Sequence, residues 1–123
     1  TSAEVNTVGV FKSQFFGATP VYVRGGMNDW GTASQLAYAQ GEYSVTIDVS
    51  AGNVEFKVAS EDWATFNLGA VDGDNKTVTV GQPMQLLQSS NDNLVFDAPA
   101  TGSYTFTVRG PNPLSPTVTV TQN

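Results

Sequence analysis

Apolar and polar residues alternate at a period of two through much of this chain, and this pattern limits what it can fold into. The clearest run, residues 43–49, places an apolar side chain at every second position. The same alternation recurs in segments 54–58, 104–108 and 117–121. Successive side chains of a strand point to opposite faces, so the pattern predicts strands that are buried on one face. Because no amphipathic helix accompanies them, the sequence predicts an all-β fold, an immunoglobulin-like antiparallel β-sandwich.

Turn signals between these runs predict how the strands connect. The Gly-containing turn at 51–53 predicts an antiparallel hairpin over 42–59, and the Gly- and Pro-rich turn at 110–113 predicts a terminal hairpin. Further short strands are expected at 5–16, 21–24, 77–80, 84–87 and 94–96.

Length and composition narrow the class of protein. The 123 residues are enough for one domain with its own core, and we expect a single domain over 1–123. The chain has no Cys and no His, which removes disulfides, thiolate metal sites and the usual general base near neutral pH. A net charge of −6 disfavours nucleic acid and anionic membranes as partners.

The low charge and the many small polar residues are typical of a secreted, extracellular domain that faces an uncharged partner. No stretch is long and apolar enough to span a bilayer. The N-terminus lacks a basic region followed by an apolar one. We therefore expect a mature or excised piece, with any signal peptide outside it.

The carboxylates do not form a pattern that predicts catalysis. Glu61 and Asp62 are adjacent, so in an extended chain they would point in opposite directions. Residues 72–75, Asp-Gly-Asp-Asn, resemble half of a calcium loop but lack the later Glu, and such strings are usually turns. We expect no enzyme activity, no cofactor and no metal site, although the sequence leaves open whether Asp72 and Asp74 hold calcium.

The two tryptophans, Trp30 and Trp63, are the strongest candidates for function. Each follows a strand end and lies beside a carboxylate, Asp29 or Asp62. Burying either ring would bring that charge with it, which is costly. We therefore expect at least one exposed ring face. The alternative is that one Trp fills the core, as in many immunoglobulin-like sandwiches.

Exposed indoles among polar residues suit a sugar polymer as ligand. A sugar ring has an apolar face of C–H bonds, which an indole can cover, and a rim of hydroxyls, which polar groups can satisfy. Lys57 is predicted to point away from the core on the strand that leads to Trp63. The residues thus indicate a module that binds a neutral glycan.

Two segments resemble a known family. Residues 21–30, Val-Tyr-Val-Arg-Gly-Gly-Met-Asn-Asp-Trp, are similar to the signature of starch- and glycogen-binding modules, in which Gly-x-Phe/Met-Asn-x-Trp presents the first stacking Trp. Residues 41–58 resemble their next hairpin, whose Phe/Tyr-Lys-Phe/Val motif precedes a second Trp. The likeness covers 20–66 and is to carbohydrate-binding module families 48 and 69, found in bacterial amylases and pullulanases.

The resemblance implies a non-catalytic module that binds α-glucan (starch, glycogen or pullulan) and anchors a covalently linked glycoside hydrolase. It implies stacking by Trp30 and Trp63 and hydrogen-bond donation by Lys57. Further sugar contacts are expected from Asn28, Asp62, Asn91 and Asn93. The alternatives are a module for another neutral glycan and a structural spacer domain, which would bury both indoles.

Overall fold

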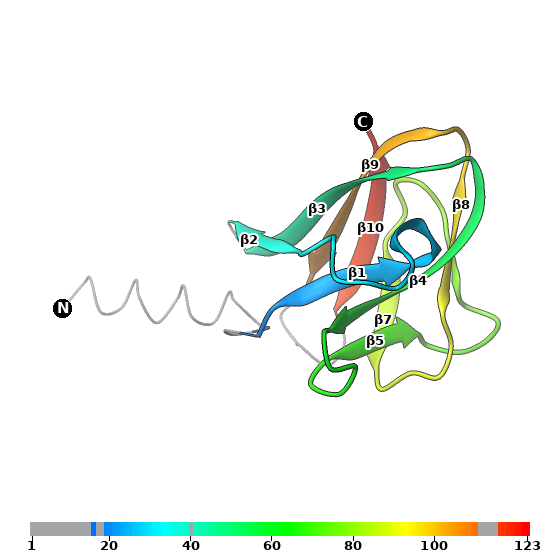
Figure 1. Cartoon of the computed structure of the whole chain (residues 1–123). Helices are drawn as coiled ribbons and strands as arrows, with labels where there is room; N and C mark the ends of the chain where they lie inside the picture. Colours follow the sequence, from blue (N-terminus) through cyan, green and yellow to red (C-terminus); the bar gives the residue numbers. More distant parts are fainter. Residues whose placement is uncertain (1–15, 17–18, 40, 111–115) are drawn as a thin grey trace.

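The computed structural model describes residues 16, 19–39, 41–110 and 116–123, and in that part the chain is almost entirely β-structure (Figure 1). The elements are β1 (Val21–Gly25), the 3-10 turn η1 (Gly26–Asn28), β2 (Ala37–Ala39), β3 (Glu42–Val49), β4 (Gly52–Ser60), β5 (Asn67–Ala70), β6 (Thr77–Val78), β7 (Met84–Gln88), β8 (Leu94–Ala98), β9 (Gly102–Arg109) and β10 (Thr117–Gln122). None of the helical segments described could cross a membrane.

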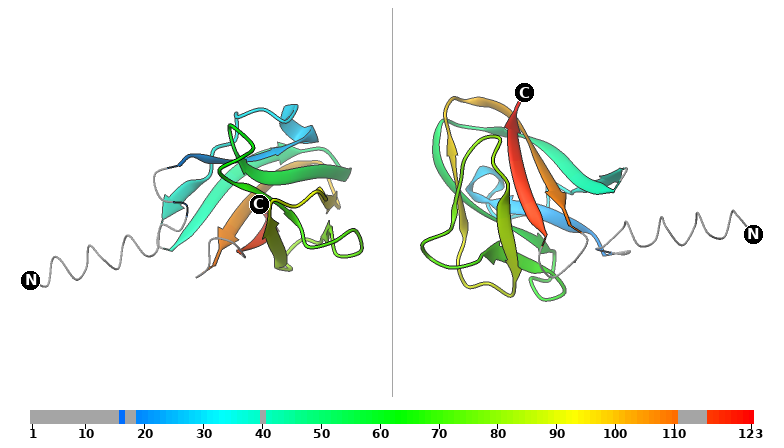
Figure 2. Two further views of the ribbon diagram at one scale, coloured as in Figure 1. Left: turned by 90° about the horizontal axis from the view of Figure 1, so that it is seen from below. Right: turned by 180° about the vertical axis from the view of Figure 1, so that it is seen from behind.

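The strands form two layers that β7 joins. One layer has the order β2-β3-β9-β10, and the other contains β5, β4, β8 and β6, with β1 on the free edge of β4. Met84 and Gln85 of β7 pair with β10, whereas Leu86, Leu87 and Gln88 pair with β5. Seen from below and from behind, the two layers lie face to face (Figure 2). All pairs are antiparallel except β6–β8, which confirms the predicted antiparallel β-sandwich; the immunoglobulin-like topology stays a prediction.

One hydrophobic core fills the space between the layers. Its largest members are Phe56 and Phe96 from one layer and Tyr104 and Phe106 from the other, all fully buried. Phe56 and Phe106 meet edge to face with ring centroids 5.3 Å apart, and Phe96 and Tyr104 do so at 5.1 Å. Such T-shaped contacts are the favoured geometry for aromatic pairs. The alternation in the sequence therefore identified the inward faces of β4 and β9 correctly.

The terminal hairpin is confirmed, but the predicted hairpin over 42–59 is wrong. β9 pairs with β10 along its length, whereas β3 pairs with β2 and β9, and β4 pairs with β1, β5 and β8. Ser50 and Ala51 carry the chain from one layer to the other. Period-two alternation states which face of a strand is buried, and not which strand lies beside it. Of the predicted strand at 5–16, only Phe16 lies in the described part, where it is buried.

The candidate site lies on the outer face of the layer that contains β4, the face that points away from the core. β4 is the strand that links the elements of this face. It pairs with β1 through Phe56–Ser60, with β8 through Gly52–Phe56 and with β5 through Val58 and Ala59. Directly opposed residues of paired strands share a face. Tyr22 and Arg24 of β1 therefore lie on the outer face, together with their β4 partners.

At Gly25, β1 packs closely against the backbone of β4. A Cβ atom there would lie 2.3 Å from the Glu55 carbonyl oxygen and 2.6 Å from the Phe56 Cβ atom. Neither obstacle is a flexible side chain, so the two strands would have to separate.

We expect Gly25→Ala to lower the free energy of unfolding by about 3 kcal/mol, the upper end for overpacking. Urea denaturation followed by circular dichroism measures the change. Gly102→Ala is the control, because a Cβ atom at Gly102 meets nothing within 4 Å. That variant should match or slightly exceed the parent. Equal loss in both variants would contradict the steric explanation.

Candidate functional site

Each tryptophan sits in a tight turn with unusual backbone geometry. Trp30 follows η1 and Trp63 follows β4, with φ of 61° and 59°, in the left-handed region. Their amides donate to the carbonyls of Gly25 and Ser60, over 2.9 Å and 3.2 Å. A bulky non-glycine residue in this region is a genuine outlier and costs about 1–3 kcal/mol. The surrounding structure must therefore hold both turns in place.

The two indole rings lie side by side at the surface. Their centroids are 6.2 Å apart and their planes are inclined by 44°. Both residues are half-buried, so neither ring is sealed in the core. Segments 33 positions apart in the sequence thus form one aromatic surface with two tilted facets.

Arg24 connects the two turns. Its Nε donates to the Trp30 carbonyl over 2.8 Å. Its Nη1 donates to the carbonyls of Ser60 and Glu61, each over 3.0 Å. The guanidinium carbon also lies 3.9 Å from the ring centroid of Trp63, a cation–π contact. Arg24 is only 8% exposed, so these contacts replace the water that its charge has lost.

Lys57 lies opposite Arg24 in the β1–β4 register and points out of the core, as predicted. Its side chain crosses Gly69 of β5, where a Cβ atom would come within 2.8 Å of the Lys57 Cε. Its ammonium donates to Asn67 Oδ1 over 3.0 Å and to the Ser90 carbonyl.

Lys57 is consequently only 7% exposed. Its predicted role as a hydrogen-bond donor to sugar called for a more exposed side chain. Burial lowers the pKa of Lys57, and the nearby charge of Asp92 acts in the opposite direction. An ammonium has three donors, and the contacts to Asn67 and Ser90 use two of them. Donation to a sugar stays a prediction for the third.

Asn28 supports the Trp30 turn from within. Its Oδ1 accepts from the Gly25 amide over 3.1 Å. Its Nδ2 donates to the Val23 carbonyl over 2.8 Å and to Ser34 Oγ over 3.1 Å. The side chain that we expected to contact sugar thus has its hydrogen bonds inside the protein.

Asp62 stabilises the Trp63 turn in the same way, by hydrogen bonds within the turn. Its Oδ1 accepts from Ser60 Oγ over 2.6 Å. It also accepts from the amides of Ala64 and Thr65, over 3.0 Å and 3.1 Å. Its Oδ2 accepts from Thr65 Oγ1 over 2.8 Å. The bond from Ser60, followed by those from Ala64 and Thr65, holds the pKa of Asp62 well below its ordinary value.

The two predicted asparagines lie beside the Lys57 contacts. Asn91 is exposed and directly follows Ser90, whose carbonyl Lys57 binds. Asn93 donates to Glu55 Oε1 over 3.3 Å. The structure therefore brings together Trp30 and Trp63 around Arg24. A second group, around Lys57, adjoins it across the β1–β4 pair.

Sequence reasoning did not single out Arg24 or Asn67. The alternation of residues 21–24 did place Arg24 on the outer face, opposite the core valines. It gave no sign that the guanidinium would bind two distant turns. Asn67 carried no signal, because its role follows from the pairing of β5 with β4.

Residues 72–75 form a turn that Asp72 closes. Its Oδ1 accepts from the amides of Asp74 and Asn75, over 2.9 Å and 2.8 Å, and from the Asn75 side chain. The Asn75 side-chain bond, followed by that from the Asp74 amide, lowers the pKa of Asp72. Among the described residues, no group of three or more acidic, His or Cys side chains is placed to hold a metal ion.

The fold is shared with a protein of known class. No protein-family model matches the chain, and no curated protein matches it. Among solved structures, the ligand-induced structure of AmyP-SBD, the starch-binding domain of an amylase, superposes with a TM-score of 0.63. The match covers 85% of this chain and 72% of that chain at 20% sequence identity. The chain folds like a starch-binding domain. The fold that the resemblance of residues 20–66 implied is thereby confirmed.

We expect Arg24→Lys to lower the free energy of unfolding by about 2–4 kcal/mol. A lysine ammonium cannot reach three carbonyls and an indole face in the geometry of the guanidinium. Urea unfolding followed by tryptophan fluorescence measures the loss. Arg109→Lys is the control, because Arg109 is an exposed residue paired with Glu42. It should change stability by less than about 0.5 kcal/mol. Equal effects would show that Arg24 does not hold the turns.

Asp62 should contribute to the acid stability of the fold. Because its folded-state pKa is depressed, the contribution is present above the unfolded value, 3.8, and is lost as pH falls below it. Urea midpoints measured from pH 7 to pH 2 should therefore converge for the parent and Asp62→Asn. Parallel curves for Asp62→Asn would contradict this assignment.

Proposed function

We propose that this chain is a non-catalytic module that binds α-glucan by stacking on Trp30 and Trp63. The observation that carries the proposal is the half-exposed indole pair, held over Arg24 on a fold shared with a starch-binding domain. The module is secreted, and it anchors a covalently linked amylolytic enzyme to starch, glycogen or pullulan.

Stacking accounts for a modest affinity. If each indole removes roughly 60–100 Å² of apolar surface from water, each stack contributes about 1.5–2.5 kcal/mol. Association costs translational and rotational freedom, so two stacks and a few hydrogen bonds give micromolar to millimolar binding. Tethering to an enzyme on a polymeric substrate raises the effective affinity without new contacts.

The inclination of the rings favours a curved glycan over a flat one. A ribbon-like β-1,4 chain presents successive sugar faces in one plane and suits coplanar aromatic platforms. The 44° between the planes of Trp30 and Trp63 suits a chain that bends between neighbouring units, as α-1,4-linked glucan does. The tilt is the feature that supports starch over cellulose.

The carboxylates near the rings support a binding role over hydrolysis. Glycoside hydrolysis uses two carboxyl groups that converge on one bond. Asp62 has both oxygens engaged in its own turn, with Ser60, Ala64 and Thr65 as donors. Asp62 is therefore not free to act as one of such a pair.

The proposal is tested by affinity electrophoresis through gels containing soluble starch. The parent should be retarded, and Trp30→Ala and Trp63→Ala should each lose most of the retardation, about tenfold or more in affinity. Val71→Ala, which truncates another exposed apolar side chain, is the control and should migrate like the parent.

Xylan and cellulose gels run alongside separate the glycan classes. Retardation by starch but not by these two supports an α-glucan module. A parent that no gel retards, with tryptophan variants of the same mobility, would instead favour a spacer domain.

A further inference from the structure

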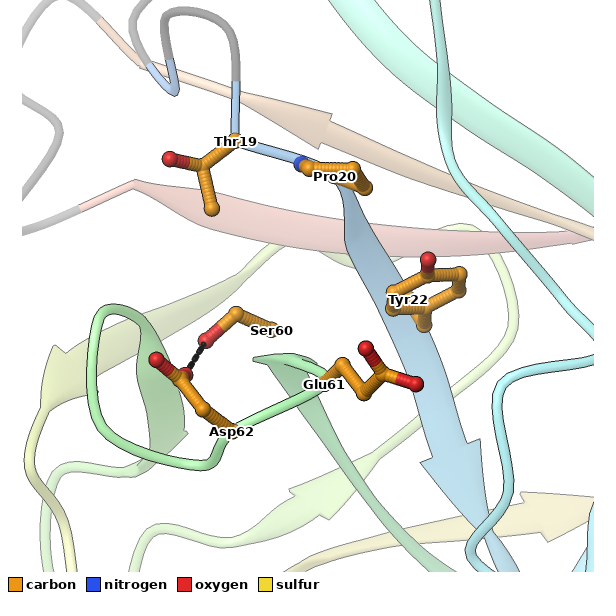
Figure 3. A pocket seen from close by; sticks show the side chains of 6 residues that line it. All are labelled: Thr19, Pro20, Tyr22, Ser60, Glu61 and Asp62. Atoms are coloured by element: carbon orange, nitrogen blue, oxygen red, sulfur yellow. Dashed lines mark hydrogen bonds between the residues drawn. The ribbon is translucent and has the colours of Figure 1, made fainter.

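A hollow lies beside the Trp63 turn. It is lined by Thr19, Pro20, Tyr22, Ser60, Glu61 and Asp62, and has a volume of about 160 Å³. Figure 3 shows the Tyr22 ring over β1 with the Glu61 carboxylate near it, Thr19 and Pro20 at one end and the Ser60–Asp62 pair at the other. No predicted role was assigned to Tyr22 or Glu61.

The hollow adjoins the turn that carries Trp63. Residues 60–62 line it and lead directly into Trp63. Tyr22 precedes Arg24 by two positions on the outer face of β1, so the two side chains are about 7 Å apart along the strand. Arg24 in turn holds the carbonyls of Ser60 and Glu61 and lies against the Trp63 ring. A chain seated on Trp63 therefore has Tyr22 as its next neighbour in this direction.

The lining has the chemistry of a sugar subsite. The half-buried ring of Tyr22 and the pyrrolidine of Pro20 supply apolar surface for a C–H face. The Glu61 carboxylate is exposed, and none of the described residues donates a hydrogen bond to it, so it can accept from hydroxyls. Two carboxylates, at Glu61 and Asp62, disfavour a phosphate or another anion. A neutral hydroxylated ligand fits.

We propose that this hollow is an additional subsite, which takes the next glucosyl unit of an α-glucan chain stacked on Trp63. The Tyr22 ring covers one face of that unit, and Glu61 accepts from its hydroxyls. The inference rests on the proposed function and adds a consequence to it: the module distinguishes longer chains from shorter ones.

The test compares a short and a long ligand by calorimetric titration. The parent should bind maltoheptaose more tightly than maltotriose. Tyr22→Ala should weaken maltoheptaose binding about tenfold, the loss of one stacking contact, and leave maltotriose binding unchanged. Glu61→Gln should weaken only maltoheptaose, by about threefold. Tyr22→Phe, which keeps the ring, should behave like the parent.

The outcomes separate the two proposals. If Tyr22→Ala and Glu61→Gln bind both ligands as the parent does, or lose affinity for both equally, the subsite is overturned and the α-glucan function stands. If the parent binds neither ligand, both proposals fall. Thermal unfolding of each variant establishes that it is folded, and if Tyr22→Ala does not fold, the exposed Glu61→Gln decides the question.

Discussion

The buried guanidinium of Arg24 is the interaction on which the candidate site depends. It joins two turns that carry strained tryptophans, and its acceptors among the described residues are main-chain carbonyls and one indole face. Taking a cation out of water is costly unless its donors are satisfied. Three carbonyls and the ring quadrupole of Trp63 provide that satisfaction. These contacts fix the position of the guanidinium, and its hydrogen bonds hold the two turns, with their left-handed backbone, in place.

Two cations lie on the outer face of the β1–β4 pair. Arg24 and Lys57 are directly opposed, an arrangement that like charges ordinarily disfavour. Their head groups diverge, because Arg24 binds the two tryptophan turns whereas Lys57 binds Asn67 and Ser90. Each cation thus organises a separate loop region over one sheet. Close packing of Gly25 against β4 keeps β1 near enough to β4 for Arg24 to reach the carbonyls of Ser60 and Glu61.

The sequence predicted the faces of the strands better than their partners. Val54, Phe56 and Val58 were expected on one face, and Phe56 and Val58 are fully buried. The predicted hairpin over 42–59 was wrong because the alternation of apolar and polar residues does not indicate which strands pair along their edges. The sequence predicted that the polar residues near the rings contact sugar. Asn28 and Asp62 instead form hydrogen bonds within the turns that carry the tryptophans. Short polar side chains next to a turn bond most readily to nearby backbone.

The sequence by itself determined that the fold is all-β, which side chains face the core, and that both tryptophans lie in polar turns after strands. These properties follow from local alternation and from the cost of burying charge. Only the tertiary structure decided that the rings meet. In the antiparallel β1–β4 pair, Gly25 lies opposite Phe56 and Ser60 opposite Val21, so the strand ends that lead to the two turns point in opposite directions. The turns come together because Arg24 reaches both, and no local pattern records a contact between residues so far apart in the chain.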